Sequence, residues 1–155
     1  MEQRVNRVTD HACFGCGEQN PIGLRLAFYR RQEAVEALFT PRPEHEGYAG
    51  LVHGGILATL LDEAMSWAVI AQTHHLMVTA RMEITYRQPV EVGQPLRVVG
   101  WVEQQRARSA RARAAVHAAT TGALLVEAHG LFLRAPEERE RAWWSRYAPA
   151  DSGER

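Results

Sequence analysis

The chain has 155 residues, 46% of them hydrophobic, which is enough for one domain with a substantial core and too short for two comfortable ones. The formal net charge is zero, which excludes a global field that favours nucleic acid or an acidic membrane surface. Two cysteines do not make a disulfide framework, and the N-terminal residues lack the apolar core of a signal peptide, so we expect a cytoplasmic protein.

The chain begins with a polar segment, residues 1–9, for which we expect a short helix or a loose arm. The turn-rich sequence HACFGCGEQNPIGL follows and contains Cys13 and Cys16. Three interpretations of this Cys-x-x-Cys pair stay open. A buried or loosely exposed thiol pair is favoured over a zinc site, which would need ligands distant in sequence or from a partner chain because only His11 lies nearby. Redox chemistry is least favoured, because such motifs normally open a helix after a strand. We expect no metal.

Residues 24–30 and 34–39 are rich in aromatic and aliphatic side chains, and they predict a first hairpin that turns at residues 31–33. Pro41 and Pro43 end it, because a central strand does not accept prolines. The glycine-rich loop 44–50 then brings His45, Glu46 and Tyr48 close to the start of the next element. Charged residues in such loops are more often solvated than catalytic.

Residues 50–71 predict one long helix, because apolar residues recur at three- and four-residue steps: Leu57, Leu60, Leu61, Ala64, Ala68 and Ala71. Asp62 and Glu63 interrupt this run, so we expect no membrane span. Asp62 lies away from the centre of the stripe, on a side that is not freely polar. A carboxylate there needs a partner or a catalytic role, and pairing with an arginine or capping a backbone group is the simpler alternative. For Glu63 we expect a salt bridge.

The helix is preceded by His53-Gly54-Gly55. Glycines let the backbone approach a ligand, and the first amides of a helix can hold an anion or a developing oxyanion. Gly55 and Asp62 are about two turns apart, which predicts that the carboxylate lies on the same side as the start of the helix and that both can serve one substrate. His53 either fixes the helix entry or contacts the substrate.

After the helix, residues 76–87 alternate, with one apolar face made by Val78, Ala80, Met82, Ile84 and Tyr86. Residues 96–104, 110–118 and 123–134 predict three more strands, the last two joined at residues 120–122, and such short connections join antiparallel neighbours. The fold class is α+β, a curved antiparallel sheet wrapped around one long central helix. A second copy of the chain would cover the side of the helix that holds Asp62, giving a homodimer. In the tail we expect a short surface helix around Trp143, Trp144 and Tyr147.

The element order, the His53-Gly54-Gly55 sequence followed by Asp62, and the leader CFGCGEQNPIGL resemble the hotdog-fold acyl-CoA thioesterases, in the branch related to phenylacetate-pathway thioesterases. The resemblance covers residues 24–134. It implies an N-terminal leader over residues 1–23 with the Cys-x-x-Cys, a hotdog thioesterase domain over residues 24–135 and a C-terminal tail over residues 136–155.

The resemblance also implies hydrolysis of an acyl-CoA thioester to the carboxylic acid and coenzyme A. Asp62 would be general base or nucleophile, the Gly54 amide would hold the oxyanion and Thr79 would position the attacking water. Substrate-binding residues would be His53, Gly55, His45 and Arg81. The expected partners are the acyl-CoA and a second copy of the chain, with active sites at the subunit interface of a homodimer or dimer of dimers. No cofactor, nucleic acid or membrane is expected.

One position departs from the family pattern. Many members have an asparagine in the loop before the His-Gly-Gly sequence, where this chain has Gly47. Either His45, Glu46 or Tyr48 takes over its contact, or the activity is weak. The alternative function is therefore a non-catalytic acyl-CoA binding or regulatory protein. Four arginines near a predicted hairpin turn are either an exposed polar face or partners for the phosphates of coenzyme A: Arg106, Arg108, Arg111 and Arg113.

Overall fold

The computed structural model describes residues 2–149, which form one six-stranded sheet and two α-helices. In chain order the elements are β1 (Tyr29–Arg31), β2 (Ala34–Phe39), the 3-10 helix η1 (Pro43–His45), α1 (Gly54–Thr73), β3 (Met77–Tyr86), β4 (Leu96–Gln105), β5 (Ser109–Ala118), β6 (Leu124–Arg134) and α2 (Glu137–Tyr147).

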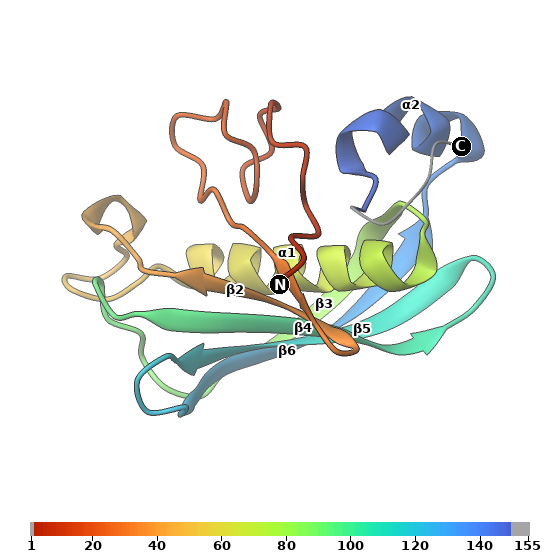
Figure 1. Ribbon diagram of the computed structural model, residues 1–155. Coiled ribbons are helices and arrows are strands. Elements are labelled where there is room, and N and C mark those ends of the chain that lie inside the picture. Colours follow the sequence, from red (N-terminus) through yellow and green to blue (C-terminus); the bar gives the residue numbers. More distant parts are fainter. Residues whose placement is uncertain (1, 150–155) are drawn as a thin grey trace.

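The sheet is antiparallel throughout, with the strand order β1-β2-β4-β5-β6-β3, and it curves around α1 (Figure 1). One side of α1 packs on the concave face of the sheet. Every second residue of a strand faces the helix, and most of these residues are small or aliphatic. The buried residues of this layer include Leu57, Leu60, Leu61, Ala64, Val98, Ala112, Ala114, Val126 and Phe132. This arrangement confirms the predicted α+β hotdog fold.

The helix approaches the sheet most closely at β4. An added Cβ at Gly100 would overlap the carbonyl group of Ala64 on α1, so only a glycine fits there. At Gly130 of β6, an added Cβ would lie 2.9 Å from the sulfur of Met65. These two glycines therefore let the apolar side of α1 lie directly on the strands.

The four strands after α1 begin and end within one residue of their predicted positions. The helix itself starts at Gly54, four residues later than predicted, because Leu51 and Val52 form bridges with Glu91 and Glu46. It continues to Thr73 and ends at His74, which has the left-handed conformation with φ of 56°.

The prediction of a strand over residues 24–30 is wrong for most of that range, because β1 has only three residues. Arg25 has a φ of 56°, which interrupts an extended strand. The amides of Leu24 and Leu26 donate to the carbonyls of Phe14 and Gly15, so this segment pairs with the leader, and Leu24 and Leu26 are buried.

The leader and α2 lie on the side of α1 that faces away from the sheet (Figure 1). Part of the surface that we expected a second copy to cover is therefore covered by the same chain. Residues 2–9 contain no helix; Arg4 bridges to Tyr29 and Val5 is buried. The predicted tail helix is confirmed as α2, and the ring of Tyr147 at its end packs at an angle against His11 with ring centroids 5.0 Å apart.

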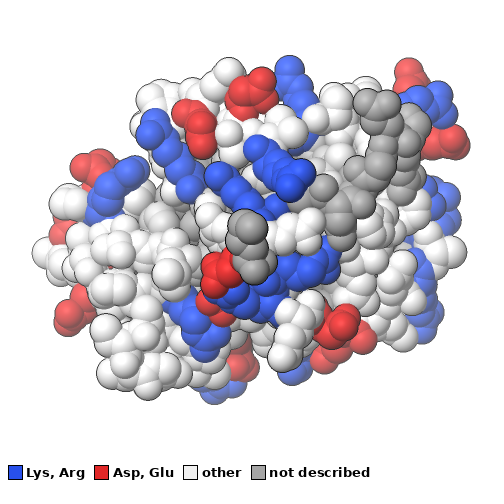
Figure 2. Space-filling model, in the orientation of Figure 1, with Lys and Arg blue, Asp and Glu red and all other residues white. Residues whose placement is uncertain are grey.

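By length and composition alone, α1 would be able to cross a membrane, contrary to the expectation from Asp62 and Glu63, but 56% of its most apolar window is buried inside this fold. Its apolar character is that of a core helix. Figure 2 shows basic side chains gathered near the middle of the viewed face with acidic side chains beside them, in keeping with a formal net charge of zero.

Candidate active site

The first turn of α1 is organised by His53. This residue is the N-cap of the helix, and its Nδ1 accepts a hydrogen bond of 2.8 Å from the Gly55 amide. The amides of Ile56 and Leu57 donate to the His53 carbonyl. Among residues 2–149, the Gly54 amide donates to no acceptor. The cap therefore uses the Gly55 amide and leaves the Gly54 amide available at the positive end of the helix dipole.

Tyr86, at the end of β3, contacts the carbonyl group of Gly54. Its hydroxyl donates a 2.8 Å hydrogen bond to the Gly54 carbonyl. Sequence reasoning placed Tyr86 on the apolar face of its strand but did not assign it a role. The alternation showed that it faces the helix, while its partner depends on where α1 starts.

Asp62 and Thr79, both candidate catalytic residues, are in contact at the edge of the sheet. The Thr79 hydroxyl donates to Asp62 Oδ1 over 2.7 Å. Burial raises the pKa of Asp62 above its ordinary value, and the hydrogen bond from Thr79 opposes that rise. Asp62 thus has one fixed oxygen and a partly desolvated carboxyl group, which is the environment of a tuned base or nucleophile.

A register shift between Thr79 and Arg81 decides which side chains of β3 face the helix. Thr79 pairs with Phe132, which is fully buried against α1, whereas Arg81 pairs with Leu131 and shares a face with the exposed Arg111. The bulge reverses the alternation, so the predicted apolar face is correct at Met82 and Ile84 but wrong at Val78, which is 46% exposed.

The bulge also places Arg81 on the face of the sheet opposite to Asp62. There it lines an open pocket with Glu83, Glu103 and His129. In a single chain the structure does not bring Arg81 to the carboxylate, so its role in substrate binding stays a prediction.

His45 is buried, with 3% of its surface exposed. Its Nδ1 accepts from the Arg42 amide over 2.9 Å and its ring packs at an angle against Phe39, while its carbonyl accepts from the His53 amide. Burial, followed by the charge of Arg42, lowers the pKa of His45. In this chain His45 supports the loop that leads into α1 at His53.

Gly47 lies in the same loop, directly against His53. An added Cβ at Gly47 would lie 3.0 Å from the Cα of His53, which is tighter than ordinary packing. An asparagine of the family pattern would therefore require His53 or the loop to shift. Of the residues considered as substitutes for it, Tyr48 is 88% exposed, whereas Glu46 accepts a hydrogen bond from the Gly50 amide.

Glu63 has different partners from those predicted. Within residues 2–149 it forms no ion pair. Its Oε1 accepts from the Trp67 indole over 3.2 Å and from the Cys13 thiol over 3.6 Å. The leader thus packs on α1 one residue beyond Asp62, and Cys13 and Cys16 are both free thiols. Sequence spacing gave no signal for this contact, which joins residues 50 positions apart.

This chain is similar in sequence to known thioesterases. The family model described as the thioesterase superfamily matches residues 49–124. Acyl-coenzyme A thioesterase THEM4 of Xenopus laevis is 27% identical over 119 residues, which cover 76% of this chain and 53% of the relative. The chain spans about half the length of the curated relatives it matches.

Solved structures show the same fold. A thioesterase superfamily protein from Shewanella loihica has a TM-score of 0.62 and 29% identity, over 72% of this chain and 91% of the other. The E. coli PaaI protein from the phenylacetic acid degradation operon has a TM-score of 0.67 and 18% identity, over 73% and 81% of the two chains. In sequence and in fold, this chain is therefore similar to proteins of the thioesterase superfamily.

Proposed function

We propose that this chain hydrolyses an acyl-CoA thioester to a free carboxylic acid and coenzyme A, and that it does so as a homodimer. The name of the THEM4 relatives supports the substrate class. The observation that carries the proposal is the 2.7 Å hydrogen bond from Thr79 of β3 to Asp62 of α1. The N-cap of the same helix leaves the Gly54 amide available.

The reaction needs few groups. Asp62 takes a proton from a water held by Thr79, the water oxygen attacks the carbonyl carbon, and the negative charge that forms on the carbonyl oxygen is held by the Gly54 amide. The C–S bond then breaks, and the coenzyme A thiolate leaves and takes up a proton. A thiol with a pKa near 8.5 departs without a strong general acid. Direct attack by Asp62 on the carbonyl is the other route open to the same residues.

The spacing of the two groups points to sites shared between chains. Eight residues of α-helix separate Gly54 from Asp62, a rise of about 12 Å. A base and an oxyanion donor must each lie about 3 Å from the reacting atoms. We therefore assign the Gly54 amide and the Asp62 carboxylate of each site to different chains. This assignment replaces the earlier expectation, in which the Gly54 amide and the Asp62 carboxylate of the same helix act on the same substrate.

The open edge of the sheet is the surface proposed for pairing. β3 is an edge strand of ten residues, and Val78 and Tyr86 on it are 46% and 51% exposed. Long exposed edges are templates for strand pairing. A two-fold axis between two β3 strands sets the two α1 helices antiparallel, so that the start of one helix lies beside the middle of the other.

The test is hydrolysis of a panel of short-chain, medium-chain and aryl acyl-CoAs by the wild type, Asp62→Asn and Asp10→Asn. Asp10 is exposed and serves as the matched control. We expect kcat to fall by about 100-fold or more in Asp62→Asn, because the base or nucleophile is lost, and to stay unchanged in Asp10→Asn.

Two outcomes contradict the mechanism. Hydrolysis by Asp62→Asn at the wild-type rate would remove Asp62 from the chemistry. Tight acyl-CoA binding by the wild type without turnover of any panel member would instead favour the binding or regulatory protein, for which the occupied space at Gly47 is the supporting observation.

A further inference from the structure

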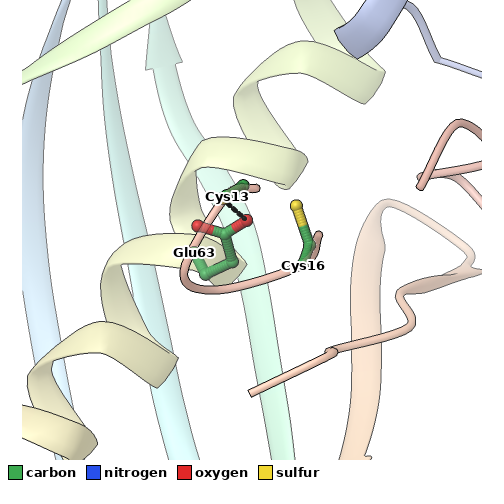
Figure 3. Close-up of side chains that lie close together, drawn as sticks. All are labelled: Cys13, Cys16 and Glu63. Carbon is green, nitrogen blue, oxygen red and sulfur yellow. Dashed lines mark hydrogen bonds between the residues drawn. The ribbon is translucent and has the colours of Figure 1, made fainter. Parts of the chain in front are cut away.

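A second cluster of reactive side chains lies beside the proposed active site. The sulfur atoms of Cys13 and Cys16 and a carboxylate oxygen of Glu63 all lie within 4.8 Å of one another. Figure 3 shows the leader wrapped around the Glu63 side chain, so that both cysteines and the carboxylate meet between the leader and α1. Nothing in the proposed hydrolysis uses these groups.

The backbone of the leader is shaped for this contact. An added Cβ at Gly15 would lie 2.6 Å from Glu63 Oε2, and one at Gly17 would lie 2.6 Å from the Cys13 amide nitrogen. The Gly17 amide donates to the Cys13 carbonyl, which closes a tight turn around the two cysteines. Only glycines at these positions let the turn approach the carboxylate so closely.

The sulfur of Cys13 is surrounded by donors. Hydrogen bonds from the Cys16 thiol and from the amides of Cys16 and Gly15 lower its pKa to about 5, although burial acts in the opposite direction. Cysteine binds metal ions as the thiolate, so a metal ion bound here would displace the Cys13 proton that is now shared with Glu63.

Its neighbours lack compensating charge. Burial, followed by the negative charge of Cys13, raises the pKa of Glu63 to about 8, and the hydrogen bond to Cys13 followed by burial raises the pKa of Cys16. Within residues 2–149 no ion pair reaches Glu63. Two sulfur atoms and a carboxylate oxygen within 4.8 Å of one another are thus a set of donors whose negative charge a divalent cation would neutralise.

We propose that Cys13, Cys16 and Glu63 bind a thiophilic divalent metal ion of the zinc class, which fastens the leader to α1. In a tetrahedral zinc site, with sulfur about 2.3 Å and oxygen about 2.0 Å from the ion, the two donor atoms lie about 3.5 Å apart. The distance from Cys13 Sγ to Glu63 Oε1 is 3.6 Å. Thiolate ligands select zinc over magnesium or calcium.

The protein supplies three ligands and leaves a fourth position for solvent. His11 does not take that position, because its Nδ1 accepts from the Cys13 amide and its Nε2 lies 3.0 Å from the Val8 carbonyl oxygen. A disulfide between the two cysteines is the competing chemistry, but it would give no role to the third donor, Glu63.

Metal titration of the reduced, chelator-treated full chain tests the site directly. We expect one Co²⁺ per chain with a sulfur-to-cobalt charge-transfer absorption, displaced by Zn²⁺. Cys13→Ser, Cys16→Ser and Glu63→Gln should each weaken binding by about 10-fold or more, because each removes one ligand. The control Glu18→Gln removes an exposed carboxylate of the same segment and should bind as the wild type does.

Zn²⁺ should also raise the Tm of the wild type and of Glu18→Gln, but not that of Cys13→Ser. The proposal is overturned if the reduced wild type binds no Co²⁺. A Cys13–Cys16 disulfide in the protein as isolated would not change this criterion, because the titration uses the reduced protein. It is equally overturned if Glu63→Gln, with wild-type circular dichroism, binds as tightly as Glu18→Gln. The titration needs no hydrolysis, so its result is independent of the proposed thioesterase activity.

Discussion

At the scale of single residues, the first two amides of α1 have different roles. The Gly55 amide binds the helix cap, and the Gly54 amide is available for the proposed chemistry. His53 Nδ1 binds the Gly55 amide, and an added Cβ at Gly55 would lie 3.0 Å from that nitrogen. A side chain at Gly55 would therefore disturb the cap. Of the two interpretations of His53, the cap geometry supports the one in which it fixes the helix entry.

Thr79→Val tests the contact between Thr79 and Asp62. The substitution keeps the β-branched shape and removes the hydroxyl that donates to Asp62 Oδ1. A hydrogen bond to a charged group contributes about 1.5–3 kcal/mol, so we expect kcat on the best acyl-CoA substrate to fall by about 10- to 100-fold. Thr85→Val, on an exposed position of the same strand, should leave kcat unchanged. Equal rates for the two variants would show that Thr79 is an ordinary strand residue.

The sequence pattern alone indicated Asp62 and Gly54 as candidates, whereas Thr79 was predicted only through the family resemblance. The spacing of residues on a helix predicts the direction of the Asp62 side chain. It does not predict that Thr79, on a later strand, contacts this side chain. Tyr86 and the Glu63 contact with Cys13 were missed because both depend on tertiary packing across 32 and 50 residues.

At the scale of elements, the close packing of α1 on β4 gives a stability prediction. Gly100→Ala adds a methyl group where it overlaps the Ala64 carbonyl, so helix and strand must move apart. We expect a loss of about 1–3 kcal/mol in the free energy of unfolding, measured by urea denaturation. Gly54→Ala is the control, because its added Cβ lies 3.5 Å from Tyr86, an ordinary contact distance. A Gly100→Ala protein as stable as the control would contradict this packing.

Glu140 connects α2 to the strands. Its carboxylate accepts from the Leu76 amide over 2.9 Å and from Arg134 over 3.0 Å, and it lies 3.0 Å from His75 Nδ1. Burial alone would raise the pKa of Glu140, but the hydrogen bonds from Arg134, Leu76 and His75 bring it below its ordinary value of 4.5. Because the pKa is lowered in the folded state, this stabilisation is present above pH 4.5 and is lost as pH falls through the folded pKa.

Thermal unfolding as a function of pH measures this effect. At pH 7, Glu140→Gln should lower Tm by on the order of 3–6 °C, because hydrogen bonds to a charged group are weakened. The difference from the wild type should shrink as pH falls below 4.5. Glu138→Gln, at an exposed position of α2, should have no effect at either pH. A pH-independent difference would show that charge on Glu140 is not what stabilises the contact.

The elements that the sequence predicted best are those in which hydrophobic residues recur at a regular spacing. The strands β3 to β6 and the body of α1 follow from alternation and from three- and four-residue spacing. The segment 24–28 failed because its buried, alternating side chains have the strand pattern, whereas Arg25 with its positive φ turns the backbone toward the leader. The bulge after Thr79 likewise has no signature in the composition of β3.

At the scale of the whole molecule, the proposed chemistry requires a second copy of the chain. Asp62 and Thr79 lie at the β3 edge, while the Gly54 amide lies about 12 Å away along α1. The leader and α2 lie on the other side of α1 within the same chain, and we propose the β3 edge as the surface for pairing. The division of each site between two chains is the central claim.

Complementation between two inactive variants tests that claim most directly. Gly54→Pro removes the amide hydrogen and adds a ring. The first position of a helix accepts proline, and His53 before it already has φ of −59° and ψ of 135°. Gly54→Pro and Asp62→Asn should each be inactive alone. Unfolded and refolded together at equal amounts, they should recover about a quarter of the wild-type rate, because half of the dimers are mixed and each mixed dimer has one intact site. A mixture as inactive as its two components would contradict the account.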